Sequence, residues 1–204
     1  TVHDPNLNLT FDGLVDWTKK DSRFDFHIGI DHANLYQLKF TKDATSLLKG
    51  DIVVQVAGNS VDNLQGDVFV NETTYTNSKS TYFFTDFKVN SSFDENKIRT
   101  ITVNSPDIVE GKIEGKYKFN QLRKLVENSL GSLYTNYKPN KVEKGQFLNF
   151  DFSINNKIVE VLFPEISIET NTVVKGKINS DKNEFKLNFN SPQIIAAKNT
   201  FDNV

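Results

Sequence analysis

Apolar residues alternate with polar ones along most of this chain, and this two-residue period is the strongest constraint on its fold. The pattern is clear in residues 7–11, 24–30 and 52–56. It returns at 68–70, 82–89, 101–103, 109–119, 148–154, 159–163, 166–168 and 185–189. Such alternation predicts strands with one apolar and one polar face. Turn-forming clusters such as "AGNS" and "NSDKNE" separate the runs, which predicts an antiparallel meander.

The predicted sheet has an apolar face that something must cover. A second sheet, helices, curling of the sheet or an apolar ligand could do so. Helical periodicity is scarce: we expect one short amphipathic helix at 120–134 and a shorter helical turn at 42–48. One short helix cannot cover a sheet of roughly a dozen strands. The sequence therefore predicts a mostly β fold with an apolar face that is not fully covered.

Composition excludes several classes of protein. The 204 residues include 24 basic and 26 acidic side chains, which are interspersed and give a net charge of −2. This balance argues against binding to nucleic acid. No Cys is present and no apolar run is long enough for a membrane helix. The chain has no Met and begins with "TVHDPNLNLTF", so we expect residues 1–204 to be a single segment of a longer protein.

One phrase occurs twice, at a spacing of 86 residues. Asn-Ser-Pro is found at 104–106 and again at 190–192, and each copy follows a polar turn and an alternating run. One interpretation is a strand-turn-strand unit that is used more than once, as in stacked β architectures. The other is convergence, because Asn, Ser and Pro are common in turns.

No arrangement of residues indicates catalysis. His27 and His32 are five residues apart on a predicted strand, a spacing that places them on opposite faces, and His3 stands alone. The carboxylates have no neighbouring base or nucleophile in a recognisable motif. We therefore expect a protein that is not an enzyme and that has no cofactor and no metal.

Four stretches carry a resemblance to a known family. They are "DPNLNLTFDGLVDW" (4–17), "VAGNSVDNLQGDVFVNETTY" (56–75), "VNSSFDENKIRTITVNSPDIVEGKIEGKYKFNQLRKLVENSLGSLYTNYKP" (89–139) and "FPEISIETNTVVKGKI" (163–178). This text resembles the TamB-type translocation and assembly module proteins of the AsmA-like superfamily, in the version found in Bacteroidetes. The resemblance covers nearly the whole chain. It lies in phrasing and strand pattern, since the family has no catalytic motif.

The resemblance implies a fold, a location and a function. The fold is a long antiparallel curled sheet, like a taco, with an apolar inner groove and one short helix. The parent protein is anchored in the inner membrane and crosses the periplasm, and this chain is an interior periplasmic segment. The implied function is phospholipid transfer between the two membranes, assembly of outer-membrane proteins, or both. The implied partners are phospholipid acyl chains, unfolded barrel clients and, through regions outside this segment, an outer-membrane β-barrel protein.

The alternation gives candidate residues for the groove. They are Val54, Val56, Val68, Val70, Ile101, Val103, Ile113, Phe150, Phe152, Val161, Phe185, Leu187 and Phe189. The residues expected to cap it are Leu122, Leu125, Val126 and Leu130. For each of them an ordinary core position is the competing interpretation. For the whole chain the alternative is a carbohydrate-binding or adhesin-like β-sandwich, with a closed core and a ligand site in its loops.

Overall fold

The computed structural model describes residues 1–131, 136–163, 165–182, 184–196 and 199–204. The strands of the main sheet are β1 (Val2–Asp4), β2 (Leu7–Asp16), β3 (Arg23–Asn34), β4 (Leu47–Ala57), β5 (Gln65–Thr76), β6 (Thr81–Phe84), β7 (Phe87–Phe93), β8 (Arg99–Ser105), β9 (Val109–Lys116), β10 (Phe147–Ile154), β12 (Thr172–Asn179) and β13 (Glu184–Asn190). A small second sheet contains β11 (Ile166–Ile168), β14 (Gln193–Ala196) and β15 (Asn199–Asp202). The helices are α1 (Phe119–Gly131) and α2 (Asn156–Leu162).

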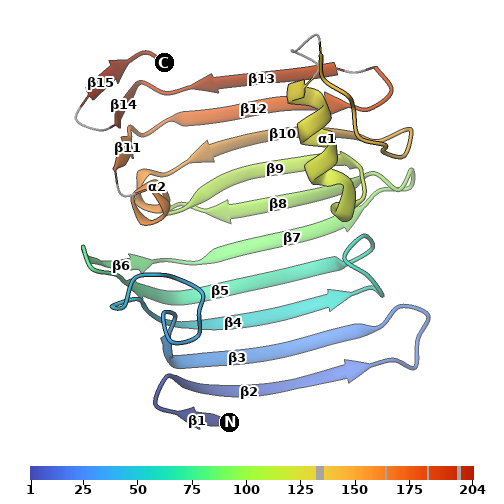
Figure 1. The fold of residues 1–204 in the computed structure, drawn as a ribbon. Coiled ribbons are helices and arrows are strands. Elements are labelled where there is room, and N and C mark those ends of the chain that lie inside the picture. The colour runs from blue at the N-terminus through green and yellow to red at the C-terminus, as the bar shows by residue number, and fades with distance from the viewer. Residues whose placement is uncertain (132–135, 164, 183, 197–198) are drawn as a thin grey trace.

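The main sheet is an antiparallel meander, as the alternation predicts. Its spatial order follows the chain from β1 to β13, with β11 in the small sheet and β6 paired to the far end of β5 (Figure 1). Every paired strand in it runs antiparallel to its neighbour. In the described part of the chain, β1 and β13 end the sheet and do not pair with each other, so the sheet is not closed into a barrel.

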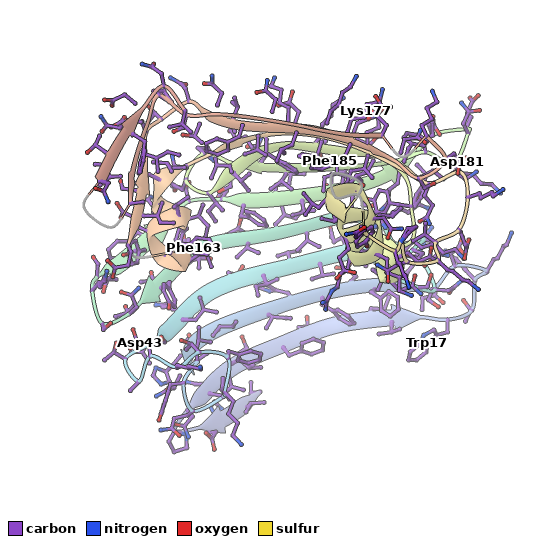
Figure 2. The ribbon with its side chains drawn as sticks, turned by 45° about the horizontal axis from the view of Figure 1, so that its top comes forward. Trp17, Asp43, Phe163, Lys177, Asp181 and Phe185 are labelled. Carbon is purple, nitrogen blue, oxygen red and sulfur yellow. The ribbon has the colours of Figure 1, made fainter. Side chains whose placement is uncertain are left out.

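The sheet is curved, and its two faces differ. In Figure 2 the β12–β13 end bends over the side on which α1 lies, so that this side is concave. Phe185 lies on the concave side close to α1, whereas Lys177 lies on the opposite, convex side (Figure 2). The small sheet and α2 lie at the ends of the strands away from α1 (Figure 1). The described structure therefore consists of one large curved sheet with two helices and a three-stranded sheet beside it.

The helix predicted at 120–134 is present as α1, which begins at Phe119. Its described part ends at Gly131, and residues 132–135 lie outside the described residues. The helical turn expected at 42–48 is wrong, because β4 already begins at Leu47. The Asp43 carboxylate instead accepts hydrogen bonds from the backbone N–H of Ser78 and from both donors of Thr45. These bonds lower the pKa of Asp43 and hold the 35–46 loop against the β5–β6 turn.

The strand predicted at 159–163 is also wrong, since most of it belongs to α2. The Asn155 side chain caps this helix by accepting a hydrogen bond from the Lys157 backbone N–H at 3.0 Å. In the first turn of the helix, Asn156 Nδ2 donates to Glu160 Oε1 at 2.6 Å. Capping and this pair within the helix outweigh the strand preference of the Val residues.

Both Asn-Ser-Pro phrases lie where a long strand ends. Ser105 is the last residue of β8, and Ser191 follows the last residue of β13. Both serines are buried, and Ser191 Oγ lies 2.7 Å from Thr172 Oγ1. The repeated phrase therefore marks equivalent corners of the sheet, an arrangement that both duplication and convergence would give.

Candidate functional site

The concave face consists of rows of apolar side chains that cross the strands. Partners in neighbouring strands share a face, so the pairing register identifies each row. One row runs Phe26, Val54, Val68, Val89, Val103, Gly111, Phe152, Val174 and Phe189. A parallel row runs Phe24, Val56, Gly66, Ser91, Ile101, Ile113, Phe150, Gly176 and Leu187.

The register brings nearly all the candidate groove residues to this one face. Val70 pairs with Phe87 beside the first row, and Phe185 pairs with Ile178 beyond the second. Every other strand candidate belongs to one of the two rows. Val161 is the exception, because it lies on α2. The structure thus places Val161 on a helix beside the sheet, where the sequence predicts a position in it.

Glycines leave room for two aromatic rings on this face. A Cβ on Gly176 would stand 2.1 Å from Phe150 Cζ, and one on Gly111 would stand 2.7 Å from Phe152 Cδ1. Real Cβ atoms do not approach so closely, so position 176 requires glycine as long as the Phe150 ring stays in place. Position 111 requires glycine wherever its ring lies, because a Cβ there would also stand 2.1 Å from the Asp151 carbonyl oxygen. The sequence Gly-Lys-Ile occurs at 111–113 and again at 176–178, and in both places the glycine beside a ring and the isoleucine two residues later lie on the concave face.

Helix α1 covers one part of the face and leaves the rest. Leu125 is only 2% exposed and packs with Leu148 and Ile178 to form the main buried cluster. Leu122 also packs against this cluster, together with Ile113. Two of the four residues expected to cap the groove, Leu122 and Leu125, therefore contact the sheet.

The other two expected cap residues point away from the sheet. Val126 is 38% exposed and Leu130 is 44% exposed. The buried side of α1 instead contains Ser129, whose hydroxyl donates to the Leu125 carbonyl at 2.7 Å. The side of α1 that faces the sheet is therefore the one with Leu125 and Ser129. Because the Ser129 hydroxyl bonds within the helix, its burial leaves no donor without an acceptor.

Most of the concave face lacks a protein cover. Val54, Val56, Val68, Val70, Ile101 and Val103 are only half-buried, and Leu187 is 54% exposed. The chain exposes 13312 Å² of surface, whereas compact monomers of this mass expose roughly 9,700 Å². Among the described residues the buried apolar side chains are Ala33, Phe84, Leu125, Leu148, Ile168 and Ile178. The face from β3 to β8 is accordingly an accessible apolar surface and not a sealed core.

An ion pair fastens α2 at the other ends of the strands. Lys157 Nζ lies 2.8 Å from Asp107 Oδ1 and also donates to the Phe83 carbonyl at 2.9 Å. Asp107 Oδ2 accepts two more hydrogen bonds, from the backbone N–H and the hydroxyl of Thr85. The hydrogen bonds from Lys157 and Thr85 lower the pKa of Asp107 to about 2. This cluster joins α2 to the β6–β7 bend and to the β8–β9 turn.

A buried arginine interrupts the apolar pattern at the α1 side. Arg99 is 6% exposed and pairs with Gly115 and Phe93 in the register of the concave face. Its guanidinium donates to the carbonyls of Val61 and Leu64 and to Ser91 Oγ, all within 2.9 Å. It also lies 4.8 Å from the Phe119 ring centroid, a cation–π distance. Burial lowers the pKa of Arg99, and the neutral acceptors keep its charge solvated.

The rest of the described chain offers little reactive chemistry. No group of three or more His, Cys, Asp or Glu side chains among the described residues is arranged to hold a metal ion. None of the helices in the described part of the chain is long and apolar enough to cross a membrane. Comparisons with protein-family models, with curated proteins and with solved structures find no match for this chain.

Sequence reasoning missed two parts of this surface. The candidate residues omit the N-terminal end of the face, although Phe26 and Ile28 show the same alternation as the chosen ones. Arg99 was not singled out either. The alternation could have placed Arg99 on the concave face, because it is two and four residues from Ile101 and Val103 in the same strand.

Proposed function

We propose that this chain is an interior periplasmic segment of a TamB-type protein of the AsmA-like superfamily, and that its concave face carries phospholipid acyl chains between the inner and outer membranes. The observation that supports this proposal is the accessible apolar face from β3 to β8. An acyl chain needs a path away from water, because each buried CH₂ is worth about 0.8 kcal/mol. No catalytic group is needed for such a path, so the protein is proposed not to be an enzyme.

The shape of the surface suits a ligand that slides. The rows of Val, Ile and Phe cross the strands, so they run in the direction in which the strands follow one another from β3 to β13. Contacts with such side chains are not directional, and a hydrocarbon tail can exchange one for the next at small cost. The two helices stand at opposite ends of the strands and both lie in the later half of the sheet (Figure 1), which leaves the earlier half of the face open.

Assembly of outer-membrane proteins is a second candidate, favoured by the edge of the sheet. In the described part of the chain β13 (Glu184–Asn190) has a partner only on its β12 side. An unfolded barrel client could add a strand there by β-augmentation. The two activities are compatible, since one uses the face and the other uses the edge. The β-sandwich alternative needs a second sheet stacked on the first, and the small β11–β14–β15 sheet has only three strands.

Site-specific photo-crosslinking in cells tests the lipid path. Probes at Val54, Val70 and Leu187 on the concave face are expected to capture phospholipid. Probes one residue further along, at Gln55, Asn71 and Asn188, face the convex side and serve as matched controls. Ile113 is unsuitable for a probe, because it packs against the α1 cluster. Equal lipid labelling at both sets of positions would refute the proposal.

A further inference from the structure

A hollow of about 500 Å³ lies at the ends of the strands beside the concave face. Its walls come from the turns after β2, β4 and β7 and from the segments that follow β9 and precede β10. Phe93, Arg99 and Tyr117 reach it from the concave face, and several lysines reach it from the turns. The volume falls within the range of ligand sites in proteins.

The charge of this hollow is net positive. Five cationic side chains line it, namely Lys97, Arg99, Lys116, Lys118 and Lys144. Three acidic side chains line it as well, namely Asp21, Asp62 and Glu143. A ligand in the hollow would therefore meet an excess of two positive charges.

The acidic side chains are already engaged within the protein. Glu143 Oε1 accepts from Lys118 Nζ at 2.7 Å, and Asp62 Oδ1 accepts from the Phe119 backbone N–H at 2.8 Å. Asp21 Oδ1 accepts from Asn59 Nδ2 at 3.3 Å.

Three other lysines, Lys116 at the end of β9 and Lys97 and Lys144 in the turns, are different. Among the described residues, Lys97, Lys116 and Lys144 form no ion pair within 4.0 Å. The charge available to a ligand in the hollow is thus cationic.

Two residues that line the hollow have buried polar atoms with unused hydrogen-bonding capacity among the described residues. Arg99 has five N–H donors, and its bonds to Ser91, Val61 and Leu64 use three of them, so two have no partner among the described residues. The Tyr117 hydroxyl is buried and has no hydrogen-bond partner in the described part of the chain. Its burial raises the pKa of Tyr117, so the group stays a neutral donor. Unused donors beside an excess of cations favour an oxyanion as ligand.

The hollow lies next to the apolar rows along β8. Arg99 is followed on the concave face by Ile101 and then by Val103. Residues two apart in a strand are about 7 Å apart, so the positive charge ends where the apolar surface begins. A ligand that fills both regions must be anionic at one end and apolar at the other.

We infer that this hollow binds the phosphate-bearing headgroup of an anionic phospholipid whose acyl chains lie on the concave face. The inference rests on the proposed lipid path and adds a place at which the headgroup is recognised. Arg99 and the lysines of the turns supply the charge, and Ile101 marks the point at which the tail begins.

Titrations of the purified chain with three probes test the inference. The probes are dihexanoyl phosphatidylglycerol below its micelle concentration, the uncharged dihexanoylglycerol with the same tails, and inorganic phosphate. Binding is measured by calorimetry, and contacts are assigned from amide shifts in NMR spectra. The variant Lys97→Glu/Lys144→Glu reverses two charges of the hollow. The control Lys42→Glu/Lys49→Glu reverses two exposed charges at the opposite ends of the strands.

The inference expects the phosphatidylglycerol probe to bind the wild type at least about tenfold more tightly than the uncharged probe, a difference near 1.4 kcal/mol. The hollow variant should lose this preference and the control should keep it. Equal binding of the two lipids would overturn the inference and leave the lipid path standing. Phosphate that binds as tightly as phosphatidylglycerol would identify a free-phosphate site and also overturn it. Failure of both lipids to bind would overturn the inference and the proposed function together.

Discussion

At the scale of single residues, the concave face depends on the absence of side chains as much as on their presence. Phe150 lies over Gly176 and Phe152 lies over Gly111, so each large ring occupies space that its neighbour leaves free. Phe150 also packs against the α1 cluster, which limits how far its ring can move. A methyl group at position 176 would therefore force the Phe150 ring to shift against the α1 cluster.

We expect Gly176→Ala to destabilise the fold by about 1–3 kcal/mol, because overpacking forces side chains out of their preferred rotamers. Urea denaturation measures the change in the free energy of unfolding. Gly29→Ala is the matched control: it lies on the convex side, where the nearest atom to the new methyl is the Thr10 hydroxyl oxygen, which can rotate away. An equal loss of stability in both variants would contradict the ring-on-glycine explanation.

The Lys157–Asp107 cluster gives a prediction about pH. Its bonds hold the folded-state pKa of Asp107 at about 2, below the ordinary value of 3.8. The stabilisation is therefore complete above about pH 4 and is lost as the pH falls towards 2. We expect Asp107→Asn to cost about 1–3 kcal/mol at pH 7, since it weakens a partly buried charged hydrogen bond.

Denaturation of both proteins across this pH range provides the check. The wild type should lose its advantage over Asp107→Asn between pH 4 and pH 2, and the two curves should meet at the acidic end. A difference that stays constant from pH 7 to pH 2 would show that the carboxylate does not act through its charge.

At the scale of elements, most strands of the main sheet could be predicted, whereas helix α2 and the strands β1, β12, β14 and β15 could not. A period of two fixes which residues share a face, so the rows of the concave face follow from sequence parity once the strands pair in chain order. Helix α2 could not be predicted from the alternation, because Ile158, Val159 and Val161 also fit a strand. The only helical signal is the cap formed by the Asn155 side chain. Uncovered surface cannot be read from parity at all, since it depends on where α1 and α2 dock.

The docking of α1 makes a prediction about neighbouring residues of one helix. Leu125→Ala should cost about 2–5 kcal/mol, the usual loss for a fully buried leucine. Val126→Ala removes the adjacent, exposed side chain and should change the free energy of unfolding by less than about 0.5 kcal/mol. Thermal or urea denaturation distinguishes the two variants. Similar losses for both would mean that α1 packs in another rotation.

At the scale of the whole molecule, one layer of sheet provides most of the structure. Three of the six buried apolar residues in the described chain form the cluster at α1, and the sheet elsewhere depends on pairing between neighbouring strands. The layer also ends in an open edge at β13, where Phe185, Leu187 and Phe189 alternate with Lys186 and Asn188. An exposed edge with an apolar side is a site at which other strands add.

We expect Leu187→Lys to reduce self-association of the purified chain, because an inward charge on an edge strand opposes the addition of another strand. Analytical ultracentrifugation over a range of concentrations measures the effect. Asn188→Lys adds the same charge on the convex side of the same strand and is expected to have a smaller effect. If the two variants associate equally, net charge and not its position controls the association.

The meander has a mechanical consequence. Each strand is held chiefly by the strand before it and the strand after it. No single set of contacts therefore bears most of an applied pulling force. A chain stretched from its two termini should give way hairpin by hairpin, in a series of small force steps, with the part clamped by α1 yielding last.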